Sequence, residues 1–220
     1  GTETLTGTST YTGATNINGG TLALASTGSI AHSGGVNLNG AASVFNISGT
    51  TAGASITSLS GVAGSSVTLG SQTLTLSGAA GTFGGVLAGS GGLTLDGGTE
   101  TLTGTSTYTG ATNINAGTLL VDGSIASSSG VTVNSGGTVG GTGTLPSTAI
   151  NGGVLSPGTP IGVLNVQGIL SFTPTSTYQV SISPSASGRT DVTGTAALSG
   201  TALVIAYPGS YPKNSTYTIL

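Results

Sequence analysis

Gly98 to Asn115 reads GTETLTGTSTYTGATNIN, and Gly1 to Asn18 repeats it letter for letter. The register continues for four more positions, in which only Gly19 against Ala116 differs, and the two copies start 97 residues apart. Identity over such a length indicates an internal repeat, which determines the architecture and is therefore interpreted first.

Within one copy, single apolar residues stand between polar neighbours, as in Thr4-Leu5-Thr6 and Asn16-Ile17-Asn18. Because successive strand side chains point to opposite faces, each triplet sends one side chain inward and two outward. Glycines such as Gly7 and Gly13 separate the triplets and allow the chain to bend. Short strands alternating with bends predict a solenoid, in which stacked coils bury a core that one coil lacks.

The residues between the two copies follow the same pattern of short alternating runs and glycines, although their amino-acid sequence differs. Val36-Asn37-Leu38 and Leu93-Thr94-Leu95 are alternating runs bounded by glycine or asparagine, which is typical of strands. No window places apolar residues at helical spacing over three turns. If four coils fill the repeat period, each coil has about 24 residues, and about nine coils form a rod about 40 Å long at ~4.8 Å per coil.

The composition excludes several classes of protein. Charged residues make up 3% of the chain, a composition that does not favour disorder. The apolar runs are far shorter than the ~20 residues of a transmembrane helix. The only bases are Arg189 and Lys213, which argues against nucleic acid as a partner. Cysteine is absent, so disulfides and thiolate chemistry are excluded.

The composition changes near residue 145. All seven prolines lie beyond it, and longer strands are predicted at 177–183 and 202–207, with 184–189 as a hairpin tip between them. We therefore predict β-helix coils over 1–145 and a capping module of the same β-helix over 146–220. In that module, proline, aromatic residues and a hairpin would protect the last coil from edge-to-edge pairing.

Segments of both regions resemble a known family. Leu5–Leu22 and its twin at 102–119 resemble the passenger-associated repeat of bacterial autotransporters, because Tyr-Thr-Gly, Asn-Ile-Asn and Gly-Thr-Leu recur in fixed register. Segments near the C-terminus are similar to the end of such passengers: Gly153–Gly158, Thr177–Val180, Asp191–Ala196 and Tyr217–Leu220.

The resemblance implies an all-β, right-handed parallel β-helix, pertactin-like, with the C-terminal β-hairpin cap acting as an autochaperone. The handedness rests on the resemblance, since the six-residue spacing of Leu5, Tyr11 and Ile17 would equally suit a left-handed helix. It also implies type V secretion in a Gram-negative bacterium. The passenger would be displayed at the outer membrane or released by cleavage, and its own outer-membrane barrel would lie outside this fragment.

The sparse charge and the repeat favour an adhesin or aggregation factor, a virulence function. Its partners would be a host surface, a matrix protein, a glycan or sister passengers. Outward rows of Thr, Ser and Asn suit such weak, multivalent contact, but they suit a passive stalk that presents an upstream domain as well. A β-helix polysaccharide-degrading enzyme is the remote alternative.

The acidic residues do not predict a catalytic site. There are five: Glu3, Asp96, Glu100, Asp122 and Asp191. Glu3 and Glu100 are repeat equivalents and should lie several coils apart. Asp96 and Glu100 are close enough in sequence to meet across a turn, for which we expect a solvated role.

Other candidate residues also have structural explanations. Gly91–Asp96 half-matches a calcium-binding repeat but lacks its third glycine and tandem copies, so it cannot supply six to eight oxygen ligands. His32, the sole histidine, cannot build a normal zinc site and should lie on a turn. No serine has a nucleophile-elbow sequence around it. We therefore predict no catalytic, cofactor-binding or metal-binding residues and no enzymatic activity.

The tyrosines divide into two groups. Tyr11 and Tyr108, each between threonines, are expected in the core rather than in an exposed sugar-stacking ladder. Tyr207, Tyr211 and Tyr217 are better candidates for a contact surface, although capping of the last coil is the expected role.

Overall fold

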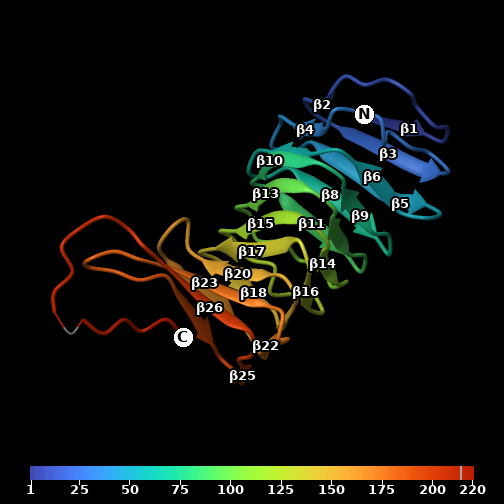
Figure 1. Cartoon of the computed structure of the whole chain (residues 1–220). Coiled ribbons are helices and arrows are strands. Elements are labelled where there is room, and N and C mark those ends of the chain that lie inside the picture. The colour runs from blue at the N-terminus through green and yellow to red at the C-terminus, as the bar shows by residue number, and fades with distance from the viewer. Residues whose placement is uncertain (214) are drawn as a thin grey trace.

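The computed structural model describes residues 1–213 and 215–220. The regular elements of these residues are β-strands, and no helix is found among them. The strands stack into an elongated rod with the two termini toward opposite ends (Figure 1). In the described part of the chain, no helical segment could cross a membrane.

The strands form four sheets. The ten-stranded sheet contains β2 (Thr15–Ile17), β4 (Val36–Leu38), β7 (Leu59–Gly61), β10 (Ala79–Phe83), β13 (Gly98–Leu102), β15 (Gly117–Val121), β17 (Gly137–Gly141), β20 (Val154–Pro157), β23 (Thr177–Ile182) and β26 (Thr201–Ala206). The eight-stranded sheet contains β6 (Ala54–Ile56), β9 (Leu74–Leu76), β12 (Leu93–Leu95), β14 (Thr112–Ile114), β16 (Val131–Asn134), β19 (Thr148–Asn151), β22 (Leu170–Phe172) and β25 (Ala196–Ala197). The five-stranded sheet contains β1 (Thr2–Leu5), β3 (Thr21–Ser26), β5 (Val44–Thr50), β8 (Ser66–Gly70) and β11 (Val86–Gly89). The three-stranded sheet contains β18 (Thr144–Leu145), β21 (Val163–Val166) and β24 (Arg189–Val192).

Successive strands visit the sheets in turn, which makes the chain a solenoid. β8, β9 and β10 lie in the five-, eight- and ten-stranded sheets, and β11, β12 and β13 follow the same order. Neighbouring strands pair in parallel from β1 with β3 to β23 with β26. The ten strands of the longest sheet correspond to about ten coils. The predicted all-β parallel solenoid is confirmed, and its handedness stays a prediction.

The predicted coil length is wrong. Thr99 pairs with Thr118, an offset of 19 residues, and Thr138 pairs with Val154, an offset of 16. Coils near both ends come closer to the expected length, as in the Thr21–Val44 pair with an offset of 23 and the Thr177–Thr201 pair with an offset of 24. The error arises because the repeat period is not a whole number of coils: β1 lies in the five-stranded sheet, whereas its copy in β13 lies in the ten-stranded sheet.

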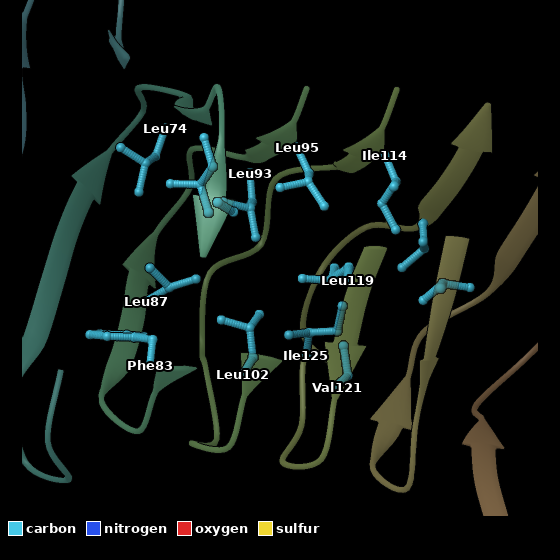
Figure 2. Packing of buried hydrophobic residues seen from close by; sticks show 14 of the residues in the cluster. Leu74, Phe83, Leu87, Leu93, Leu95, Leu102, Ile114, Leu119, Val121 and Ile125 are labelled. Carbon is cyan, nitrogen blue, oxygen red and sulfur yellow. The ribbon is translucent and has the colours of Figure 1, made fainter. Parts of the chain in front are cut away.

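The core is a set of apolar columns enclosed by the sheets. Leu93 pairs with Leu74, and Leu95 pairs with Ile114, so equivalent inward positions stack from coil to coil. Figure 2 shows these side chains pointing into the space between the sheets. All four are essentially inaccessible to solvent. Burial of each such side chain contributes about 1.5–3 kcal/mol, so the stack of coils supplies the stability that a single coil lacks.

Glycine is required at one corner of the repeat. Gly98 and Gly117 have φ angles of +77° and +80°, in the region that favours glycine. A Cβ on Gly98 would overlap the Ala79 carbonyl oxygen of the preceding coil, and a Cβ on Gly117 would overlap the Gly98 carbonyl oxygen. Gly98 and Gly117 therefore allow both the turn and the close approach of adjacent coils.

The expected hairpin between the last long strands does not form. β23 and β26 are parallel neighbours, because the chain between them completes a coil through β24 and β25. Residues 181–188 instead fold back on the end of β23 as a short antiparallel hairpin, in which Ile182 bridges Ser187 and the Ser183 amide donates to the Ala186 carbonyl at 2.7 Å. All six residues of β26 are exposed. Ile219 packs on the core at this end, together with Ile182 and Val192, and the Tyr178 hydroxyl donates to the Ile219 carbonyl.

Candidate functional site

The second repeat copy builds a buried chain of hydroxyl groups. Tyr108 is fully buried, and its hydroxyl lies 2.7 Å from Thr112 Oγ1, which lies 3.1 Å from Ser128 Oγ. Ser128 Oγ also donates to the Gly110 carbonyl at 2.8 Å. Burial raises the pKa of Tyr108 to about 12, and the hydrogen bonds to Thr112 and Ser128 offset this only in part. We call Tyr108, Thr112 and Ser128 the tyrosine clamp, because it links residues of adjacent coils.

The first copy builds the same clamp in a different environment. The Tyr11 hydroxyl lies 2.7 Å from Thr15 Oγ1, which lies 2.8 Å from Ser33 Oγ. Tyr11 is nevertheless 42% exposed, because its coil has a neighbour on only one side. The prediction of a core tyrosine is therefore confirmed for Tyr108 and wrong for Tyr11.

Glu100 lies inside the solenoid. It pairs with Gly81 of β10 and Leu119 of β15, in a column whose other members are small or apolar. Its side chain is fully buried, and neither carboxyl oxygen has a hydrogen-bond partner among the described residues. Burial raises the pKa of Glu100 to about 8, and the neighbouring Leu59 backbone lowers it by less. This carboxyl is therefore mostly protonated at neutral pH, and the expected solvated role is wrong for it.

Glu3 is the equivalent of Glu100 in the first repeat copy, and it lies in the first coil of the stack. Glu3 pairs with Leu22 as Glu100 pairs with Leu119, so both glutamates occupy the same position relative to the following coil. Glu3 is exposed because β1 is the edge strand of its sheet, whereas β13 lies between β10 and β15. Burial of the glutamate therefore depends on the preceding coil.

Asp96 lies on the outside and takes part in a polar ladder. The Asn115 amide donates to Asp96 at 2.8 Å, the Asn134 amide donates to Asn115 at 2.8 Å, and the Asn151 amide donates to Asn134 at 3.4 Å. We call these four residues the amide ladder. Asp96 thus has the expected solvated role, and it does not form a pair with Glu100, which faces the core.

The remaining acidic side chains also have structural partners. Asp122 accepts hydrogen bonds from the Thr142 amide at 3.0 Å and the Thr142 hydroxyl at 3.2 Å. Asp191 forms a bidentate ion pair with Arg189, in which Nε donates to Oδ1 at 2.6 Å and Nη2 donates to Oδ2 at 3.0 Å. Within the described ranges, no three His, Asp or Glu side chains gather closely enough to hold a metal ion.

The calcium-like segment Gly91–Asp96 and the lone histidine also have structural roles. A Cβ on Gly91 would overlap the Gln72 carbonyl oxygen, and one on Gly92 would overlap that of Ala111, so the half-match to a calcium repeat reflects the close approach of coils. His32 is exposed on a turn, as predicted.

The C-terminal tyrosines have different environments. Tyr207 is 38% exposed, whereas Tyr211 is half-buried and its hydroxyl donates to the carbonyls of Tyr207 at 2.6 Å and Ile182 at 3.1 Å. The rings of Tyr211 and Tyr217 meet edge to face, 6.5 Å apart. Tyr211 and Tyr217 therefore hold the C-terminal segment together, and Tyr207 is left on the surface.

The outer face of the ten-stranded sheet carries a hollow that no sequence pattern predicts, which we call the sheet groove. Its volume is about 530 Å³. It is lined by Thr118, Leu120, Thr138, Val154, Ser156, Gly158, Thr159, Pro160, Gln179, Ser181, Ile205 and Tyr207. These residues come from five neighbouring coils, so no local sequence signal reveals them.

The fold and the surface define the class of protein, which is an elongated parallel β-solenoid. Its candidate carboxylates, Asp96 and Glu100, do not form a pair. Residues 1–24 and 95–121 match the family model described as Passenger-associated-transport-repeat. The chain thus contains two segments similar to a repeat of autotransporter passengers, which supports an autotransporter passenger. No curated protein and no solved structure matches the chain.

Proposed function

We propose that this chain is part of an autotransporter passenger that acts in adhesion or cell aggregation. In this proposal, a Gram-negative bacterium displays it at the outer membrane or releases it by cleavage. The observation that carries the proposal is the presence of two passenger repeats within one continuous solenoid. The pertactin-like, right-handed form of the coil is part of the same proposal.

The outer surface supports an adhesive role. Outward positions of the eight-stranded sheet pair as Thr75 with Thr94, Thr94 with Asn113, and Asn113 with Thr132. Together with the amide ladder, these rows repeat hydrogen-bonding groups at the coil spacing of ~4.8 Å. Many weak contacts to a repetitive partner then add up through multivalency, with little charge to repel it.

Display on cells tests the adhesive role. We expect non-adherent Gram-negative cells that display residues 1–220 on an outer-membrane anchor to settle faster or to attach better to host cells, matrix proteins or glycan-coated surfaces. Sedimentation and counts of attached cells provide the measurement, and cells with the anchor alone at equal surface density are the control. Unchanged settling together with unchanged attachment would remove the adhesive role.

A passive stalk is the second candidate, favoured by the uninterrupted ten-stranded sheet. Deletion of residues 1–145 from the displayed chain separates the two functions. Loss of attachment with normal surface delivery supports adhesion by the coils, whereas full attachment without them makes the coils a spacer.

A glycan-degrading enzyme has less support. Asp96 faces the outside of the solenoid and Glu100 faces its core, so the two carboxyl groups cannot act together on one substrate.

We also propose that residues 146–220 act as a folding template after secretion. Amide hydrogen exchange of the whole chain in rising denaturant should then show the longest protection in β19 to β24. β25 and β26 are exempt, since all their residues are exposed. Earlier exchange in β19 to β24 than in β5 to β10 would contradict this role.

A further inference from the structure

The sheet groove lies over strands of adjacent coils and is bordered on one side by residues that follow two of these strands. Gly140 of β17 pairs with Leu120 of β15 and Ser156 of β20, and a Cβ on it would overlap the Ser156 carbonyl oxygen, so glycine allows these coils to approach closely beside the groove. Thr159 and Pro160 follow β20, and Tyr207 follows β26. Because parallel strands end at the same edge of a sheet, these residues border the groove on one side.

The lining of the groove is uncharged and combines hydroxyl and amide groups with apolar side chains. Thr118, Thr138 and Ser156 provide hydroxyls that can donate and accept, and the Gln179 amide, which donates to Ser156 Oγ at 3.3 Å, adds both kinds of group. None of the lining residues carries a formal charge. Of the two bases, Arg189 is paired with Asp191, and Lys213 does not line the groove. An anionic ligand would therefore find no compensating cation here.

We infer that the sheet groove binds a neutral oligosaccharide, an inference that rests on the proposed adhesive function and names its ligand class. Sugar hydroxyls match the Thr, Ser and Gln groups, and the apolar face of a sugar ring matches the exposed ring of Tyr207 and the apolar atoms of Val154. The volume lies within the range of about 300–1,000 Å³ typical of ligand sites.

The same geometry disfavours an extended peptide as the ligand. The groove lies on the face of the sheet, where the backbone groups of β17 and β20 already pair with neighbouring strands. A peptide strand gains its affinity from free backbone groups at a sheet edge, which the groove meets only at β26. Recognition over the rest of the groove must therefore come from side chains, as suits a sugar.

Calorimetric titration of the purified 220-residue chain tests the inference. The probes are the neutral hexasaccharides of cellulose, amylose and N-acetylated chitin, with hyaluronan hexasaccharide as the acidic comparison. We expect at least one neutral probe to bind and the acidic probe to bind more weakly. Gln179→Ala and Tyr207→Ala should each weaken binding about fivefold, the loss expected for one hydrogen bond or one ring contact.

Two variants serve as controls. Tyr207→Phe should retain the affinity, since the ring contact remains. Tyr11→Ala removes a similarly exposed tyrosine at the other end of the rod and should leave the affinity unchanged. The inference is overturned if no neutral probe binds, if the acidic probe binds as tightly, or if Tyr207→Ala and Gln179→Ala bind like the original chain.

Cell assays separate this inference from the adhesive function. Adhesion that persists in the Gln179→Ala/Tyr207→Ala double variant, with no sugar binding by the original chain, overturns the groove alone. Sugar binding by the purified chain without any adhesion of displaying cells overturns the adhesive function, and the groove is then a binding site with another use.

Discussion

Replacement of Glu100 by glutamine should make the protein more stable at pH 8 and leave its stability at pH 4 nearly unchanged. The buried carboxyl has no hydrogen-bond partner among the described residues, and burial raises its pKa to about 8. Glutamine has nearly the same shape as the protonated acid and cannot ionise, so the variant retains the packing and loses the titration.

The sign of the pH dependence follows from the raised pKa. Below about pH 4.5 the carboxyl is protonated in both the folded and the unfolded chain, so its titration takes nothing from the folding stability. Between about pH 4.5 and pH 8 only the unfolded chain releases the proton, and folding stability falls by up to about 1.4 kcal/mol per pH unit. Above about pH 8 the loss is complete, at up to about 5 kcal/mol.

Urea unfolding from pH 4 to pH 9 provides the measurement, and the difference between Glu100→Gln and the original chain isolates this group. The matched control is Glu3→Gln, because Glu3 has the same sequence around it but lies exposed at the edge of the stack. Glu3→Gln should leave the unfolding midpoint almost unchanged. A difference that stays constant from pH 4 to pH 9 would show that Glu100 is solvated when folded.

Tyr108→Ala should cost about 3–5 kcal/mol of unfolding free energy, whereas Tyr11→Ala should cost less than about 1 kcal/mol. Tyr108 is fully buried between coils, so its removal leaves a cavity and takes away one of the two hydroxyl partners of Thr112. Tyr11 makes the same hydrogen bond to Thr15, but its ring is 42% exposed, so water replaces much of what is lost.

Tyr108→Phe separates the hydroxyl from the ring and should cost about 1 kcal/mol, because Thr112 keeps its contact with Ser128. Urea unfolding gives the free energies, and hydrogen exchange should place the loss of protection in β11 to β16. Equal losses for Tyr108→Ala and Tyr11→Ala would contradict the role of the tyrosine clamp in coupling adjacent coils.

Local patterns predicted the architecture well. The alternation around Leu93 and Leu95 predicts strands with one buried face, and glycines between such runs predict bends, which together are enough for a parallel solenoid. The outward Thr and Asn rows and the exposed turn at His32 follow from the same alternation. These features depend on residues only a few positions apart, so the sequence contains all the information they need.

Only the tertiary structure decided whether equivalent residues of the two repeat copies are buried or exposed. Glu3 and Glu100, like Tyr11 and Tyr108, have identical sequence neighbours, yet only Glu100 and Tyr108 are buried. Alternation determines that such a side chain points toward the core, but burial requires a coil on both sides. The sheet groove and the parallel pairing of β23 with β26 likewise depend on coil lengths, which vary with each turn and place residues from distant parts of the chain side by side.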